Sequence, residues 1–213
     1  MQLIGLLGGT FNPIHFGHLR MAQSLANALH LDEVRFIPSA NPPHKVAPAV
    51  SAQHRAQMVQ LAINDNHLFK LDTRELQREG VSYTIDTLIS LREELGSNVA
   101  LVLLMGSDAF SQLNSWHRWQ ELLNYCHIIL VQRPNEQAQI KLSNEIASFL
   151  QENYTENIED LQHKNAGFMH MQKIAMHDIS ATAIRHNYQH KISNDYLLPS
   201  IVDAFIKNNH LYE

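Results

Sequence analysis

The chain of 213 residues contains a single cysteine, Cys126, so no disulfide can form within it. Cys126 lies in the strand-like run "YCHIILVQ", where we expect a small buried apolar side chain rather than a reactive thiol. One free thiol, without a signal peptide, indicates a reducing, intracellular setting. We therefore expect the chain to be cytoplasmic.

Positive charge is also scarce, because 16 Lys and Arg residues face 21 Asp and Glu residues, for a net charge of -5. A protein that binds nucleic acid regardless of sequence needs a basic surface, so no nucleic-acid partner is expected. A locally basic site for a small anion stays open. Long apolar runs are missing as well, since "ALVLLM" (100–105) is far shorter than the roughly 20 residues that span a bilayer. No membrane partner is expected.

Short apolar runs alternate with segments of helical periodicity along the chain. The predicted strands are 3–7, 34–38, 68–72, 99–105, 127–132 and 167–175. The predicted helices are 19–29, 55–63, 84–95, 115–125, 143–154, 180–188 and 199–211. Thr84 is a candidate N-cap. This alternation predicts an α/β, Rossmann-like doubly wound, mostly parallel sheet with flanking helices. We expect one domain, 1–213, in which about 135–166 is a peripheral insert.

Residues 8–18, "GGTFNPIHFGH", follow the first predicted strand and open the first predicted helix. In a doubly wound sheet, ligands bind at the carboxyl ends of the strands, where the strand order reverses. Gly8 and Gly9 let the backbone approach a ligand closely, and free N–H groups at a helix start favour an anion. His15 and His18 are spaced to face one side of the first turn, where imidazoles donate hydrogen bonds to phosphate or carry positive charge.

The histidine pair has two other interpretations besides an anion site. His15 and His18 match half of a zinc site, but zinc needs at least one further ligand, and no second ligand pair is evident. Alternatively, one histidine caps the helix and the other is solvated. The stretch matches neither G-x-G-x-x-G nor the P-loop lysine signature. We expect a phosphate site here and no metal bound by protein ligands.

A second stretch, "ISATAIR" (179–185), predicts another phosphate site near the other end of the chain. Ser180 is a candidate N-cap, Thr182 lies in the first turn, and Arg185 follows one turn later. An ordinary capped surface helix explains the same residues. Together, however, the two stretches resemble the nucleotidyltransferase superfamily. "HFGH" stands in the place of its H-x-G-H element, and "ISATAIR" is similar to I-S-S-T-x-[IV]-R, with Ala181 replacing a serine.

Shorter stretches narrow this resemblance to the bacterial nicotinate-mononucleotide adenylyltransferases. The stretches similar to that family are "PPHK" (42–45), "SYTIDTL" (82–88), "MGSDAF" (105–110), "WHRW" (116–119), "QRP" (132–134) and the C-terminal "LLPSIVDAFIKNNHLY". The resemblance covers nearly the whole chain and is weakest at about 135–166. Asn12 and Ser39 depart from the family pattern, which more often has aspartate and asparagine there.

The resemblance implies three groups of site residues. The catalytic residues, which would contact the ATP phosphates, are His15, His18 and Arg185. The ATP site would comprise Gly8, Gly9, Thr10, Phe11, Gly106, Asp108, Ser180 and Thr182. The nicotinate mononucleotide site would comprise His44, Lys45, Thr84, Trp116, His117 and Arg133.

Within these sites the family implies particular contacts. Asp108 would bind a ribose, and Trp116 would stack on the pyridine ring. Backbone N–H groups near Thr84 and His117 would receive the nicotinate carboxylate, which a helix N-terminus stabilises more than an uncharged amide. Trp119 is interpreted as a core residue and Arg55 as structural.

The implied reaction transfers the adenylyl group of ATP to nicotinate mononucleotide, releasing pyrophosphate and forming deamido-NAD in NAD biosynthesis. Mg²⁺ would arrive on the ATP phosphates, because the sequence shows no dedicated carboxylate cluster. Two alternatives remain: another nucleotidyltransferase, such as the phosphopantetheine enzyme, or a nucleotide-binding sensor without catalysis. The expected partners are thus the small-molecule substrates ATP and nicotinate mononucleotide.

Overall fold

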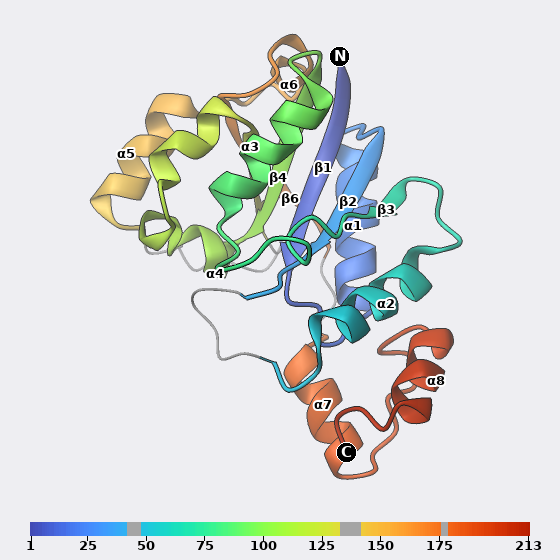
Figure 1. Ribbon diagram of the computed structural model, residues 1–213. Helices are drawn as coiled ribbons and strands as arrows, with labels where there is room; N and C mark the ends of the chain where they lie inside the picture. The colour runs from blue at the N-terminus through green and yellow to red at the C-terminus, as the bar shows by residue number, and fades with distance from the viewer. Residues whose placement is uncertain (42–47, 133–141, 176–178) are drawn as a thin grey trace.

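The computed structural model describes residues 1–41, 48–132, 142–175 and 179–213, and its strands form one six-stranded sheet (Figure 1). The order across the sheet is β3-β2-β1-β4-β5-β6, and every strand pairing is parallel. The strands are β1 Gln2–Gly9, β2 Glu33–Pro38, β3 Phe69–Leu71, β4 Val99–Gly106, β5 His127–Gln132 and β6 Met169–Lys173. Because the order reverses between β1 and β4, the predicted doubly wound α/β fold is confirmed.

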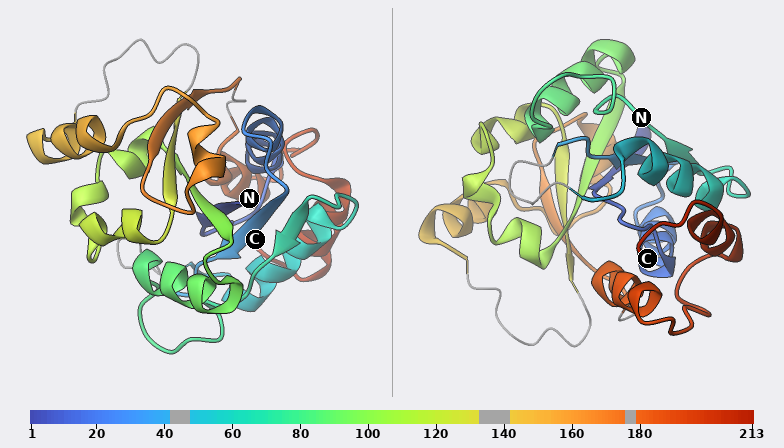
Figure 2. Two further views of the ribbon diagram at one scale, coloured as in Figure 1. Left: turned by 90° about the horizontal axis from the view of Figure 1, so that it is seen from above. Right: turned by 60° about the horizontal axis from the view of Figure 1, so that its bottom comes forward.

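Helices cover both faces of this sheet. They are α1 Phe16–Ala28, α2 Ala52–Ile63, α3 Thr84–Leu95, α4 Ser107–Phe110, α5 Asn144–Asn153, α6 Asp160–His163, α7 Ala181–Gln189 and α8 Ser200–Asn208. Two 3₁₀ helices, η1 Leu113–Ser115 and η2 Trp119–Asn124, lie between β4 and β5. Figure 2 shows α3, α4 and α5 on one side of the sheet, and α1, α2, α7 and α8 on the other. No helix among the described residues is both long enough and apolar enough to cross a bilayer.

The central strands are buried on both faces, as their continuous apolar sequences predict. In β1, Leu3 and Leu7 pack into the cluster beneath α1 and α2, whereas Ile4 and Leu6 pack into the cluster beneath α3. None of these four side chains is more than 4% exposed. Since burying a side chain of this size contributes about 1.5–3 kcal/mol, the alternation fixes the sheet firmly between its helices.

The single cysteine takes the buried place that its apolar neighbours predict. Cys126 is 0% exposed and packs in the cluster beneath α3. Burial raises the pKa of its thiol to about 12. The thiol therefore stays protonated at neutral pH and acts as a small apolar side chain.

The helix predicted at 115–125 is wrong. The structure has η1 and η2 there, and between them Arg118 adopts a left-handed backbone with a φ of 53°. A right-handed helix cannot continue through such a residue. Thr84 as an N-cap is also wrong: it is the first residue of α3, and Tyr83 occupies the N-cap position without a side-chain capping bond.

Other differences concern the ends of elements. The last helix ends at Asn208 rather than at 211, and the last strand spans Met169–Lys173 rather than 167–175. The single-turn helix α6 had no sequence signal, because four residues are too few to show a helical period. The predicted helix at 143–154 is confirmed as α5, whose N-cap is Ser143.

Candidate active site

The predicted ATP residues gather where the strand order reverses. The parallel register of β1 and β4 brings Gly9 and Gly106 to the same edge of the sheet. From there the chain turns to α1 on one face and to α4 on the other, with Asp108 exposed in the first turn of α4. A Cβ added to Gly8 or Gly106 would meet no described atom within 4 Å. The backbone at this edge is thus open to close approach, as a switch-point ligand requires.

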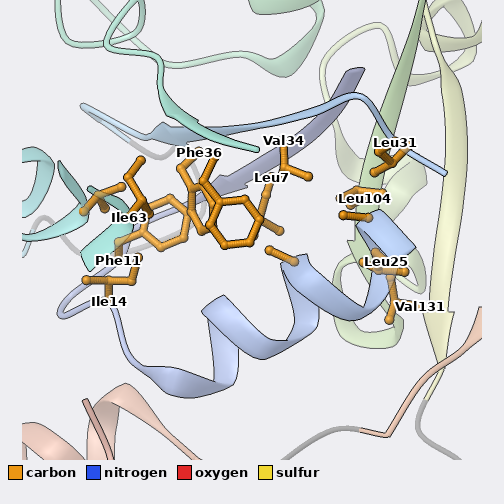
Figure 3. Packing of buried hydrophobic residues seen from close by; sticks show 14 of the residues in the cluster. Leu7, Phe11, Ile14, Leu25, Leu31, Val34, Phe36, Ile63, Leu104 and Val131 are labelled. Carbon is orange, nitrogen blue, oxygen red and sulfur yellow. The ribbon is translucent and has the colours of Figure 1, made fainter. Parts of the chain in front are cut away.

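The loop between β1 and α1 is held in place by two buried side chains. Phe11 is 2% exposed and Ile14 is 0% exposed, and both insert into the core near Phe36 (Figure 3). Phe11 has a φ of 48°, a left-handed conformation that costs a non-glycine residue on the order of 1 kcal/mol. Packing of its ring offsets that cost, so Phe11 can reach a nucleotide only through its backbone.

Arg55 fastens the same loop to the end of β2. It is 1% exposed, its Nη1 donates to the Thr10 carbonyl at 2.5 Å, and its Nη2 donates to the Ser39 carbonyl at 2.7 Å. The Ser39 N–H in turn donates to the Gly9 carbonyl at 2.9 Å. Burial lowers the pKa of Arg55, yet a guanidinium stays charged at neutral pH. These contacts fit the structural interpretation of Arg55 and place a positive charge beside the loop.

His15 and His18 face each other at the start of α1, as their spacing predicts. Their ring centroids lie 3.8 Å apart. His15 occupies the N-cap position without a side-chain capping bond, and its buried Nδ1 has no hydrogen-bond partner among the described residues. Burial lowers the pKa of His15 to about 4, so this imidazole is neutral at pH 7. It therefore offers hydrogen bonding rather than charge until a bound anion raises its pKa.

Gly17, between the two histidines, leaves room for the His15 ring. A Cβ at position 17 would lie 2.9 Å from Cε1 and Nδ1 of His15 and 3.5 Å from Cβ of Ile179. Any other residue must therefore push this ring aside. The glycine of the H-x-G-H element thus has a steric cause in this structure.

Helix α7 brings the second motif to this loop. The Arg185 Nη1 donates to the Asn12 carbonyl at 2.8 Å, across 173 positions of sequence, and its Nη2 donates to Thr182 Oγ1 at 3.2 Å. Ser180 is the N-cap of α7, as predicted, and its Oγ accepts from the Ala183 N–H at 3.5 Å. The two predicted phosphate sites therefore lie against each other.

The predicted mononucleotide residues lie on the α3 side of the sheet. Thr84 opens α3, and the ring of its neighbour Tyr83 packs on His117 with 4.5 Å between centroids. His117 is exposed, and the half-buried Trp116 packs against the core cluster beneath α3. Trp119 also packs there, with its ring against Phe149, as its core interpretation predicts. The other three predicted ligands, His44, Lys45 and Arg133, lie outside the described residues.

Tyr212 is a contact that sequence reasoning missed. Its hydroxyl donates to the Asn12 Oδ1 at 2.7 Å, across 200 positions of sequence. Asn12 thus receives a hydrogen bond from Tyr212 on its side chain and one from Arg185 on its backbone. Nothing within a few residues of Tyr212 signals this contact, because it depends on how the C-terminal segment folds back.

The described residues hold no group of three His, Cys, Asp or Glu side chains that could bind a metal ion. A zinc site built on His15 and His18 would need such a third ligand. The arrangement instead offers imidazoles, a guanidinium, hydroxyls and free helix N–H groups, which are the groups that hold phosphate oxygens.

Comparisons with known proteins agree with this geometry. Residues 6–187 match the cytidylyltransferase-like family. The chain is 42% identical over 212 residues to the probable nicotinate-nucleotide adenylyltransferase of Hydrogenovibrio crunogenus, covering 100% of this chain and 98% of that protein. It is 41% identical to the protein of the same name from Dechloromonas aromatica, covering 98% of this chain and 97% of the relative.

A solved structure shows the same fold. The nicotinic acid mononucleotide adenylyltransferase of Plasmodium falciparum, complexed with NaAD, superposes with a TM-score of 0.72 at 18% identity, covering 100% of this chain and 98% of that one. The chain thus belongs to the cytidylyltransferase-like family and, within it, to the nicotinate-nucleotide adenylyltransferases.

Proposed function

We propose that this chain transfers the adenylyl group of ATP to nicotinate mononucleotide, forming nicotinate adenine dinucleotide and pyrophosphate in NAD biosynthesis. Family membership supports this activity. The observation that carries it is the hydrogen bond from Arg185 to the Asn12 carbonyl, which joins the two phosphate-binding motifs. A triphosphate held between His15, His18 and Arg185 would have donors on both sides.

In the proposed reaction, a phosphate oxygen of nicotinate mononucleotide attacks the α-phosphorus of ATP. The bond from that phosphorus to the oxygen bridging the β-phosphate breaks, and pyrophosphate leaves with the electron pair. No protein nucleophile is required, so positioning and charge stabilisation supply the catalysis. His15 and His18 donate hydrogen bonds to phosphate oxygens, and Arg185 stabilises the charge that develops.

Other residues would hold the rest of the nucleotide. Ser180 and Thr182, at the capped start of α7, support the triphosphate next to Arg185. The open backbone at Gly8 and Gly106, with the backbone of Gly9, Thr10 and Phe11, lines the adenosine side, and Asp108 binds the ribose. Mg²⁺ enters as part of the substrate MgATP, because phosphate oxygens are its preferred ligands.

The mononucleotide would bind on the α3 side. Free N–H groups at Thr84 and near His117 receive the nicotinate carboxylate, and Trp116 packs on the pyridine ring. His44, Lys45 and Arg133 hold the phosphate. The helix start favours the acid over the amide, since only the acid carries the negative charge that a helix N-terminus stabilises.

We propose that residues 1–213 form one nucleotidyltransferase domain, and that the stretch at about 135–166 is an insert in it, attached to the core through α5 and α6. In that insert, Ile146 of α5 and Leu161 of α6 are both 0% exposed and join the clusters on opposite faces of the sheet. Both substrates are intracellular metabolites, so we place the reaction in the cytoplasm.

Pyrophosphate release tests this function. The chain is incubated with MgATP and one acceptor at a time: nicotinate mononucleotide, nicotinamide mononucleotide or phosphopantetheine. Release is expected to be fastest with nicotinate mononucleotide. Faster release with phosphopantetheine would favour the alternative transferase, and ATP binding without release from any acceptor would favour a sensor.

In the same assay, the variant His18→Ala tests the catalytic role of His18. Loss of a donor to the transition state lowers kcat by roughly tenfold to a thousandfold. Circular dichroism is expected to match that of the unmodified chain, because the half-buried His18 lies at a helix start. Near-normal kcat in a folded variant would remove His18 from the catalytic residues.

A further inference from the structure

Between β3 and α3 lies a buried carboxyl group that the proposed mechanism does not use. Glu75 is 9% exposed, and the Thr87 hydroxyl, on α3, donates to its Oε1 at 2.8 Å. The Ser82 hydroxyl also lies close enough to this carboxyl to stabilise its charged form. Burial raises the pKa of Glu75, although these hydroxyls and the charge of Arg78 oppose the shift. Burying a carboxyl group costs free energy unless it is hydrogen-bonded, so the hydroxyls around Glu75 stabilise it in this position.

Ser82 connects this carboxyl to the loop that follows β2. Its Oγ accepts hydrogen bonds from the N–H groups of Ala40 at 3.2 Å and Asn41 at 3.3 Å. The Ser82 N–H donates to the Asn41 carbonyl at 3.1 Å, and the Asn41 side-chain amide donates to the Gly80 carbonyl at 3.2 Å. A serine hydroxyl has one proton and two lone pairs. Because the two backbone N–H groups occupy the lone pairs, the hydroxyl proton of Ser82 is left for the Glu75 carboxyl.

The segment fixed in this way carries Thr84 of the proposed mononucleotide site and Tyr83, whose ring contacts His117 of that site. Tyr83 follows Ser82, and Thr84 opens α3. Glu75 thus joins, through two hydroxyls, the start of α3 and the loop after β2. In the sequence, that loop precedes His44 and Lys45, two of the predicted ligands of the mononucleotide phosphate.

We propose that Glu75 is a positioning residue for the mononucleotide site: through Ser82 and Thr87 its carboxyl fixes Tyr83 and Thr84 against the loop that follows β2. This inference rests on the proposed function, because it assumes that the mononucleotide binds beside α3. Glu75 itself does not contact substrate. The ATP site lies at the β1–β4 switch point and on α7, and none of these hydrogen bonds involves one of its predicted residues.

Substitution of Glu75 separates positioning from simple packing. Glu75→Leu keeps the side-chain volume but removes both acceptors, and it is expected to raise KM for nicotinate mononucleotide roughly tenfold, as loss of buried hydrogen bonds does. KM for ATP is expected to change by less than about twofold. Glu75→Gln keeps an acceptor for the hydroxyls and restores most of the mononucleotide affinity.

Three results would overturn the proposal. One is an unchanged KM for nicotinate mononucleotide in a folded Glu75→Leu variant. Another is an equal rise of both KM values, which would indicate a general loss of structure. The third is an equal loss in the Gln and Leu variants, which would show that charge rather than hydrogen bonding matters.

If Glu75→Leu fails to fold, Thr87→Val tests the same arrangement, since it removes one hydroxyl and leaves the carboxyl in place. It is expected to raise KM for the mononucleotide severalfold and to leave KM for ATP unchanged. An unchanged KM for the mononucleotide contradicts the proposal in this variant too.

The unmodified chain distinguishes this inference from the proposed function. Pyrophosphate release with nicotinate mononucleotide upholds the function, whatever the Glu75 variants do. If release is absent, titration calorimetry with nicotinate mononucleotide decides. Binding by the unmodified chain that Glu75→Leu weakens supports the positioning role, and binding that it leaves unchanged, or no binding at all, overturns it.

Discussion

At the scale of single residues, His15 is both buried and in ring contact with a second histidine. It is 5% exposed, and its ring lies against that of His18. Burial alone lowers its pKa from the ordinary 6.5 to about 4. The same burial that keeps it neutral also strengthens a hydrogen bond from its ring N–H to a phosphate oxygen, because little water competes.

This pKa makes the stability of the free chain depend on pH. Between about 6.5 and 4 the unfolded chain binds a proton at position 15 that the folded chain does not, so stability falls as the pH drops through this range. The contribution is up to about 3 kcal/mol. His15→Gln removes it, so urea unfolding of both proteins at pH 7 and pH 4 is expected to show a smaller acid loss for the variant. Equal losses would contradict the lowered pKa.

At the scale of elements, the start of α1 is shaped by the fit between Gly17 and the His15 ring. Glycine inside a helix normally costs about 1 kcal/mol relative to alanine, so Gly17→Ala would stabilise an ordinary helix. Here the added Cβ would lie 2.9 Å from the ring. Glycine at position 17 therefore makes the helix less stable than alanine would, but it leaves space for the His15 ring over the first turn.

A double-mutant cycle on these two positions tests this arrangement. Gly17→Ala is expected to lower both stability and kcat, whereas adding Gly17→Ala to His15→Ala is expected to stabilise by up to about 1 kcal/mol, because the ring is gone. Thermal unfolding of the four proteins gives the coupling energy. Additive effects would show that the ring and the glycine do not interact.

At the scale of the whole molecule, the C-terminal segment completes the loop that carries the histidines. Tyr212 donates to the Asn12 side chain, Arg185 donates to the Asn12 carbonyl, and the Phe16 N–H donates to the Leu197 carbonyl at 2.9 Å. Residues 12–16 are thereby joined at one place to the segment from Arg185 to Tyr212. Stability and ATP binding should be coupled through these contacts.

Tyr212→Phe tests this coupling. Loss of the half-buried hydrogen bond is expected to lower stability by about 1 kcal/mol and to raise KM for ATP severalfold, with KM for nicotinate mononucleotide unchanged. Tyr188→Phe is the matched control. The Tyr188 hydroxyl, on α7, donates at 2.6 Å to Asp203 on α8, and this hydrogen bond does not involve the loop between β1 and α1. It should lower stability without changing KM for ATP. Identical kinetics for the two variants would contradict the coupling.

Most elements could be predicted from the sequence, because their causes are local. Strands such as β1 and β4 follow from short apolar runs, and α3 and α7 follow from helical spacing with polar residues at their starts. The prediction failed at 115–125, where Arg118 takes a left-handed backbone that the surrounding helical pattern does not reveal. Thr84 was misplaced by one position, since Tyr83 takes the cap without using its side chain.

The candidate site was predictable in its chemistry but not in its assembly. The sequence by itself determined which residues offer imidazoles, a guanidinium, capping hydroxyls and free backbone, because motif and spacing span only a few positions. Only the tertiary structure decided that Arg185 and Tyr212 both reach Asn12, and that Glu75 accepts a hydrogen bond from Thr87 of α3. Such contacts depend on the packing of the whole sheet and its helices, which also removes water from His15 and so sets its charge.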